Sequence, residues 1–246
     1  MPALWYVLGV IGGIIDLALL YLLFVFILSL FVDVKKEYET DNKFYRAIFN
    51  FTTAIALWIT RVKVHVKGEE KLKDLPRFLL VGNHRSNYDP IITWYKLRKY
   101  DLSFISKPEN FKVPIFGRIV RRCCFRKIDR ENPRNAILDM RSSAKLISSG
   151  AVSMGVYPEG TRSKSKEMLP FHDGVLKIAQ FAKCPIVVTA VRGTEKIHEN
   201  YPWKRSHTYI DILKVYDVET VLATPSRELG ALIKQDLTTF FEENDK

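Results

Sequence analysis

The chain has 246 residues, of which 47% are apolar and 26% charged, enough for one large hydrophobic core or two small ones. This composition excludes a disordered or collagen-like chain, and three cysteines without zinc-type spacing argue against a disulfide scaffold or a structural metal. The net charge of +11 indicates an anionic partner, which is nucleic acid, anionic lipid or a phosphorylated substrate.

The N-terminal segment predicts a membrane anchor. Residues 4–32 are apolar apart from Asp16 and a few small residues, and a helix of this length reaches about 43 Å, more than a signal peptide needs. A second apolar stretch, Ala47 to Thr60, follows a charged connector and reaches only about 21 Å. We expect residues 1–60 to form a two-helix hairpin that dips into one leaflet; one true span followed by an interfacial helix is the alternative. A phospholipid membrane is therefore an expected partner, and nucleic acid is not.

From Arg61 onward, short apolar runs alternate with segments of helical periodicity. The predicted strands are Val62–Val66, Phe78–Val81, Leu102–Ile105, Cys123–Ile128, Ala151–Tyr157, Ile186–Val191 and Thr208–Tyr216. The predicted helices are Pro90–Lys99, Pro114–Arg122, Pro133–Ser149, Gly174–Lys183 and Ser226–Phe241. This alternation predicts that residues 61–246 form an α/β domain with a largely parallel mixed sheet flanked by helices, whose site lies in loops at the carboxyl ends of strands.

The loop after the strand Phe78–Val81 carries a candidate acid/base pair. His84 and Asp89 lie five residues apart, so their side chains meet only if the chain turns between them, as it does in a strand-to-helix loop. Asp89 before Pro90 is also a good helix N-cap, and His84 could simply end a strand. The spacing alone is therefore a weak signal.

A second polar loop, Pro158–Ser163, follows the strand Ala151–Tyr157. Its glycine permits close backbone approach, and the Arg162 guanidinium is able to hold a phosphate through two hydrogen bonds. Between the two loops lies a basic segment that runs from Lys107 to Arg130.

Taken together, four motifs resemble the glycerolipid acyltransferase family, and most closely its 1-acyl-sn-glycerol-3-phosphate (lysophosphatidate) type. They are Asn83-His84-x4-Asp89, the Lys107/Pro114/Gly117/Arg130 block, Glu159-Gly160-Thr161-Arg162 and Pro185-Ile186-Val187. The phenylalanine-lysine-glycine pattern that usually follows the third motif stands here as Phe171-His172-Asp173-Gly174, a departure that places a lysine contact to substrate in doubt.

The resemblance implies transfer of a fatty acyl group from acyl-CoA or acyl carrier protein to the sn-2 hydroxyl of lysophosphatidic acid, giving phosphatidic acid. In this chemistry His84 is the general base and Asp89 orients it. The expected substrate-phosphate-binding residues are Lys107, Arg130, Glu159, Gly160, Thr161 and Arg162, although Glu159 is better suited to orienting its loop. No metal or cofactor is expected, and the expected location is the cell membrane, with the catalytic domain on the cytoplasmic face.

Two alternatives remain at this point. Ala151-Val152-Ser153-Met154-Gly155 is one residue away from the G-x-S-x-G elbow, so a membrane-bound serine hydrolase that uses Ser153 with Asp211 and His207 is possible. The context argues against it, because Ser153 lies inside a predicted strand. The second alternative is a non-catalytic binder of anionic lipid.

Overall fold

A computed structural model describes residues 2–129, 131–163 and 167–244. The described part of the chain contains a seven-stranded sheet in the order β1-β7-β6-β2-β5-β3-β4. The strands are β1 (Val62–Lys67), β2 (Leu79–Gly82), β3 (Leu102–Ser106), β4 (Arg126–Lys127), β5 (Ser153–Val156), β6 (Ile186–Arg192) and β7 (Ser206–Tyr216). β6 and β7 run antiparallel, and every other pair is parallel. The predicted largely parallel mixed sheet is confirmed.

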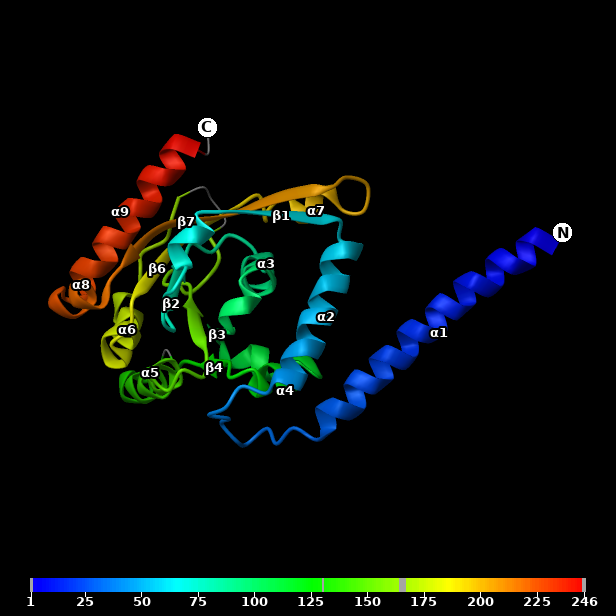
Figure 1. Ribbon diagram of the computed structural model, residues 1–246, viewed down its shortest axis with the longest axis horizontal. Coiled ribbons are helices and arrows are strands. Elements are labelled where there is room, and N and C mark those ends of the chain that lie inside the picture. Colours follow the sequence, from blue (N-terminus) through cyan, green and yellow to red (C-terminus); the bar gives the residue numbers. More distant parts are fainter. Residues whose placement is uncertain (1, 130, 164–166, 245–246) are drawn as a thin grey trace.

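Helices cover both faces of this sheet (Figure 1). The helices of the described chain are α1 (Pro2–Leu30), which does not cover the sheet, α2 (Lys43–Ile59), α3 (Tyr88–Lys96), α4 (Phe116–Arg122), α5 (Pro133–Ser148), α6 (Lys177–Ala182), α7 (Ile197–Asn200), α8 (Val218–Ala223) and α9 (Ser226–Asn244). Buried side chains of α2, α3 and α4 form one apolar cluster, and those of α5, α6, α8 and α9 form another. The sheet therefore lies between two helical layers.

Strand β2 shows how the sequence builds both layers. Leu79 and Val81 belong to the cluster with α5 and α9, whereas Phe78 and Leu80 belong to the cluster with α2 and α3. All four side chains are fully buried, because successive side chains of a strand point to opposite faces and both faces are covered here. A continuous apolar run is what such a central strand requires.

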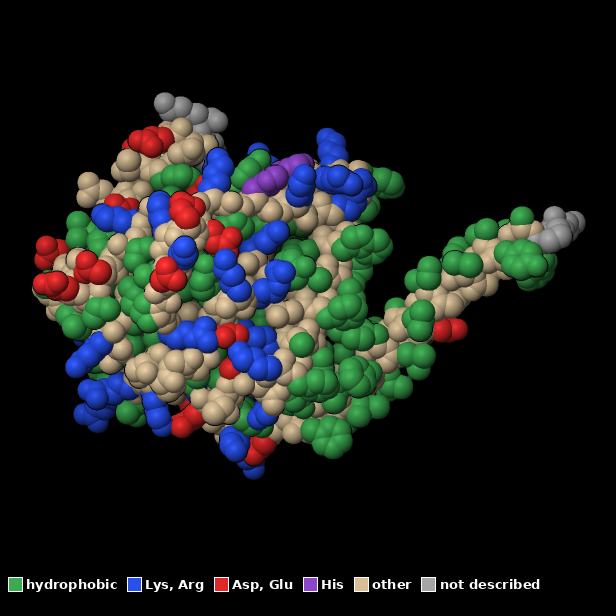
Figure 2. Space-filling view, viewed as in Figure 1, with side chains coloured by type: hydrophobic (Ala, Val, Ile, Leu, Met, Phe, Trp, Pro, Cys, Tyr) green, Lys and Arg blue, Asp and Glu red, His purple; other side chains and the backbone are tan. Residues whose placement is uncertain are grey.

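The two N-terminal helices differ in their surroundings. α1 is long and apolar enough to cross a membrane, and most of its side chains are exposed as it extends away from the body of the protein (Figures 1 and 2). α2 begins after Asn42, whose side chain caps it, and packs its buried face against α3, α4 and β1. The Tyr45 hydroxyl donates to the Leu28 carbonyl at 3.1 Å, which joins α1 to α2. The predicted domain boundary at residue 60 stays a prediction.

One predicted strand, Cys123–Ile128, is wrong over most of its length, because only residues 126–127 pair with β3. The preceding residues instead terminate α4: the Phe125 N–H donates to the Val120 carbonyl, and the Cys124 N–H donates to the Arg121 carbonyl. This is the Schellman arrangement, in which the residue after the cap adopts a left-handed conformation, here Cys124 with φ of 60°. Glycine usually occupies this position, so its sequence signal is absent.

Candidate active site

Three loops converge at the carboxyl ends of neighbouring parallel strands. β2, β5 and β3 are adjacent in the sheet and run parallel, so the segments after Gly82, Val156 and Ser106 leave the same edge. They line a cavity of about 570 Å³, a volume typical of small-molecule sites. His84, Lys107 and Arg162 all contribute to its wall.

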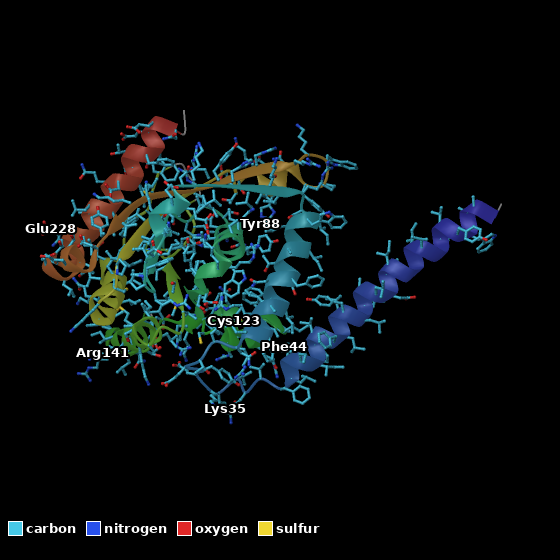
Figure 3. All side chains as sticks on the ribbon, in the orientation of Figure 1. Lys35, Phe44, Tyr88, Cys123, Arg141 and Glu228 are labelled. Carbon is cyan, nitrogen blue, oxygen red and sulfur yellow. The ribbon has the colours of Figure 1, made fainter. Side chains whose placement is uncertain are left out.

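His84 and Asp89 are in contact. The Nδ1 atom of His84 lies 2.9 Å from Oδ2 of Asp89, and the imidazole side chain is 18% exposed whereas the carboxylate is fully buried. The contact arises because the loop turns back into the first turn of α3, where Asp89 follows the labelled Tyr88 (Figure 3). An ionised carboxylate only accepts hydrogen bonds, so Nδ1 carries the proton. The other ring nitrogen, Nε2, bonds no described residue.

Asp89 is held by a complete set of donors. Its Oδ2 atom also accepts the backbone N–H groups of Arg85 and Ser86, both at 2.7 Å. Its Oδ1 atom accepts the Thr194 hydroxyl at 2.5 Å. A buried carboxylate is costly unless it is paired or hydrogen-bonded, and these bonds satisfy both oxygens and fix the direction of the side chain. Asp89 is therefore not a simple helix N-cap.

The Tyr157 ring packs against the face of the His84 imidazole. Its ring stacks on that of His84 with centroids 4.6 Å apart and planes within 20°. The Phe104 ring stacks in turn on Tyr157, with centroids 5.8 Å apart. His84 is therefore oriented by a carboxylate in the plane of its ring and by an aromatic stack across its face.

The Glu159 carboxylate connects the loop that carries His84 to the segment that carries Leu169. Its carboxylate accepts the backbone N–H of His84 at 2.7 Å and that of Leu169 at 2.9 Å, and its side chain is buried. Burial raises the pKa of Glu159, and the two N–H groups partly oppose that rise. Among the described residues that line the cavity, Glu159 is absent. These bonds suit Glu159 to positioning the backbone of the two loops, and its role at the substrate phosphate stays a prediction.

The structure places the other predicted phosphate-binding residues as follows. Lys107, Gly160, Thr161 and Arg162 line the cavity, whereas Arg130 lies outside the described residues. The Gly160 backbone has a φ of +70°, a left-handed conformation that glycine adopts without strain, and its N–H closes a turn to the Tyr157 carbonyl. Within the described part of the chain, neither Lys107 nor Arg162 forms an ion pair, so both cationic side chains are available to an anionic ligand.

The cavity also has an apolar wall. Its members belong to the cluster between the sheet and α5 and come from the ends of β3 and β5, from the residue after β4, from α5 and from the turn before α6. They are Ile105, Ile128, Ala136, Met140, Val156 and Val175. The cavity therefore combines an imidazole held by a carboxylate, two cations without an ion pair among the described residues, and a surface suited to a hydrocarbon chain.

The residues of the hydrolase alternative are not assembled. Ser153 is buried inside β5, whereas His207 and Asp211 lie on β7. β7 and β5 are separated by β6 and β2, which at about 4.8 Å between neighbouring strands places them roughly 14 Å apart. His207 contacts His65 instead, and Asp211 pairs with Arg192.

Sequence reasoning did not assign a site role to three residues. Thr194 lies 105 residues from Asp89 along the chain, and no local pattern links the two. Tyr157 was predicted only as the end of a strand. Asn83 was part of the first motif, but its role is structural: its amide donates to the Val191 carbonyl and accepts the Val191 N–H, which joins the loop to β6.

The chain is similar in sequence to known acyltransferases. A sequence profile of the Acyltransferase family matches residues 63–192. The 1-acyl-sn-glycerol-3-phosphate acyltransferase of Haemophilus influenzae is 28% identical over 72% of this chain and 76% of its own length. The enzyme of that name from Limnanthes douglasii is 29% identical over 57% of this chain, and the match spans about half of that relative, 49%.

A solved structure shares the fold. The crystal structure of the 1-acyl-sn-glycerophosphate (LPA) acyltransferase, PlsC, from Thermotoga maritima has a TM-score of 0.68 and covers 91% of this chain and 88% of its own. At 21% sequence identity this likeness concerns the fold. Because the family profile spans more than half of the chain and includes the loops that carry His84, Lys107 and Arg162, the chain belongs to the acyltransferase family.

Proposed function

We propose that this protein transfers a fatty acyl group from an acyl thioester, acyl-CoA or acyl carrier protein, to the sn-2 hydroxyl of lysophosphatidic acid and so produces phosphatidic acid. The observation that carries the proposal is the bond between His84 Nδ1 and Asp89 Oδ2 at 2.9 Å, in a cavity that also presents unpaired cations and an apolar wall. The names of the relatives support the same substrate class.

In the proposed reaction, Nε2 of His84 takes the proton of the lipid hydroxyl as its oxygen attacks the thioester carbonyl. A positioned base of this kind contributes about 10²- to 10⁴-fold to the rate. Asp89 holds the tautomer and stabilises the imidazolium that forms. When the carbon–sulfur bond breaks, the imidazolium returns its proton to the thiolate. No enzyme nucleophile is required, because the thioester is already activated.

The cavity divides the recognition of the acceptor between two surfaces. Arg162 and Lys107 would bind the phosphate of lysophosphatidic acid, and each charge-assisted hydrogen bond contributes about 1.5–3 kcal/mol. The apolar wall between β3, β5 and α5 would accommodate a hydrocarbon chain. A neutral monoacylglycerol lacks the phosphate and would lose the first contribution while keeping the second.

The same proposal includes association with the membrane. α1 is long and apolar, and most of its surface is exposed. Lipid would cover that surface. The catalytic domain would then face the cytoplasm, and lysophosphatidic acid would reach the cavity from the bilayer. Deletion of residues 1–30, which leaves the capped and packed α2 intact, should reduce activity toward vesicle-held acceptor more than activity toward a short-chain soluble one. Equal reductions would contradict this role of α1.

The decisive assay supplies labelled acyl-CoA or acyl carrier protein donors with lysophosphatidic acid, glycerol 3-phosphate or monoacylglycerol as acceptors. We expect phosphatidic acid from lysophosphatidic acid, no product with His84→Ala, and nearly unchanged activity with Ser153→Ala. Arg162→Ala should lower kcat/KM for lysophosphatidic acid about 10- to 100-fold and leave the slow reaction of monoacylglycerol unaffected.

The alternatives make the opposite predictions. A serine hydrolase would lose activity with Ser153→Ala and retain it with His84→Ala. A non-catalytic lipid binder would retain lysophosphatidic acid and release no product from any donor. Either result would overturn the proposed function.

A further inference from the structure

The loop between α7 and β7 exposes a large aromatic side chain. Trp203 is 84% exposed, and its neighbour Tyr201 is 46% exposed. The Arg61 guanidinium donates to the carbonyls of Pro202 and Trp203 at 3.1 and 3.2 Å. Because Arg61 directly follows the last turn of α2, these bonds attach the loop to that end of the helix. The Trp203 loop, residues 201–205, is therefore held in place with its indole in solvent.

Trp203 is exposed outside the apolar helix α1, where Trp5 is also exposed, at 72%. Trp94 is buried in the apolar layer beside α2, whereas Trp203 and Trp58, the latter 80% exposed near the end of α2, belong to none of the apolar clusters. An indole has a large apolar face and one N–H donor, a combination that favours the boundary between hydrocarbon and water. Both indoles lie near the carboxyl end of α2, Trp58 in its last turn and Trp203 on the loop that Arg61 holds, so both suit a surface that lipid covers.

The surroundings of the loop are basic. Lys204 and Arg205 continue it, Arg61 and Lys63 lie beside it across the β1–β7 pairing, and all four side chains are exposed. Figure 2 shows blue side chains gathered over this corner, where β1 and β7 begin. The acidic residues of the preceding segment, Glu195 and Glu199, are fewer than these cations. Aromatic side chains among lysine and arginine match a phospholipid surface that carries negative charge.

The position of the loop relative to the N-terminal helices adds a geometric argument. On the outer side of α2, Phe44, Phe51 and Trp58 are exposed at seven-residue intervals, which places them along one stripe. Figure 1 shows α1, the outer side of α2 and the Trp203 loop on the same side of the molecule. The 17 residues of α2 extend about 25 Å from the junction with α1 to the loop.

We propose that the Trp203 loop is a second contact with the phospholipid surface, separate from α1 and at the far end of α2. The inference rests on the membrane association proposed above and adds where the catalytic domain touches the bilayer. Two contacts separated by the length of α2 fix the tilt of the domain, whereas α1 joins the domain only at its carboxyl-terminal part and holds the tilt from one end. A fixed tilt holds the cavity in one orientation toward the acceptor in the bilayer.

The test uses an environment-sensitive fluorophore on a single introduced cysteine in the full chain, reconstituted in vesicles of phosphatidylcholine and phosphatidylglycerol. The native thiols of Cys123, Cys124 and Cys184 are buried, so labelling at Trp203→Cys is selective. Leu17→Cys on α1 reports insertion of the anchor. Glu228→Cys on α9, at the end of the molecule opposite α1 (Figure 3), is the matched control for an exposed site.

We expect the label at position 203 to emit at shorter wavelength and to be quenched by headgroup-proximal quencher lipids, while the label at 228 remains water-like. A water-like label at 203 together with an inserted label at 17 would overturn this inference and leave the proposed function intact. Water-like labels at both 17 and 203 would overturn the inference and the membrane association together.

A charge-reversal pair tests the basic component. Arg205→Glu in the labelled chain should lower the equilibrium constant for contact of the loop with the bilayer at least about fivefold on anionic vesicles. The effect should shrink on vesicles of phosphatidylcholine alone. Arg227→Glu on α9 makes the same charge change away from the loop and should have no effect. Equal responses of the two variants would contradict a lipid contact at the loop.

Discussion

Replacement of Asp89 by asparagine separates the charge of this residue from its geometry. Oδ2 of Asp89 accepts three N–H groups and Oδ1 accepts one hydroxyl. In Asp89→Asn only the amide oxygen accepts hydrogen bonds, so it takes the place of Oδ2, and the NH₂ group then faces the Thr194 hydroxyl, which is also able to accept. The hydrogen-bond pattern and the tautomer of His84 are thus preserved, while the negative charge is lost.

The magnitude follows from the distance. With His84 Nδ1 2.9 Å from Oδ2, the centres of the imidazolium and carboxylate charges lie about 4 Å apart, where their attraction is about 4 kcal/mol at an effective dielectric constant near 20. That attraction exists only once the imidazolium has formed, so its loss lowers kcat by about 10³-fold. The melting temperature should change little, because the three N–H groups keep an acceptor and the Thr194 hydroxyl accepts from the introduced amide.

The assay is kcat for acyl transfer, together with thermal unfolding of the same preparation. Thr194→Val is the matched control, because it removes one hydrogen-bond donor to Asp89 and keeps the charge. Loss of this hydrogen bond should cost about 1.5–3 kcal/mol, divided between the free energy of unfolding and the activation free energy. An Asp89→Asn enzyme with kcat within tenfold of the original and an unchanged melting temperature would refute the electrostatic role of this carboxylate.

Three further predictions follow from the surroundings of the site and from the sheet edge. Tyr157→Leu should lower kcat about 2- to 10-fold by removing the stack on His84, whereas Tyr157→Phe should retain activity, as steady-state kinetics would show. Glu159→Gln should destabilise the protein by about 1–3 kcal/mol in denaturant unfolding, because a single amide oxygen replaces two acceptors for buried N–H groups. Desolvation lowers the pKa of His65, with the His207 charge adding to the effect, so acidification from pH 7 to pH 5 should reduce the melting temperature less in His65→Gln than in the original chain.

The sign of the last prediction follows from the direction of the shift. The unfolded chain takes up a proton at this histidine near pH 6.5, before the folded chain does, so the stability present at neutral pH is lost as the pH falls. An equal decrease in both proteins would contradict it. Equal activity of the leucine and phenylalanine variants at position 157 would contradict the stacking role, and unchanged unfolding of Glu159→Gln would contradict the positioning role.

The sequence by itself predicted the features that depend on local pattern. Alternating short apolar runs and helical periodicities predicted the α/β class, and the continuous run Phe78–Val81 predicted a strand, which the structure shows buried on both faces. Polar residues after strands predicted the loops that line the cavity, including His84 and Arg162. These features were accessible because strand and helix periodicity, and the placement of polar groups at strand ends, are properties of neighbouring residues.

Tertiary structure alone decided which distant groups meet. Thr194 reaches Asp89 because the segment after β6 lies beside the loop after β2, and Tyr157 stacks on His84 because β5 neighbours β2. The late start of β4 at Arg126 also escaped prediction, because Cys124 adopts a left-handed conformation without glycine and so gives no local sign of the turn before the strand. Strand order and packing determine these contacts, and both depend on burying two apolar layers across the whole chain rather than on any short segment.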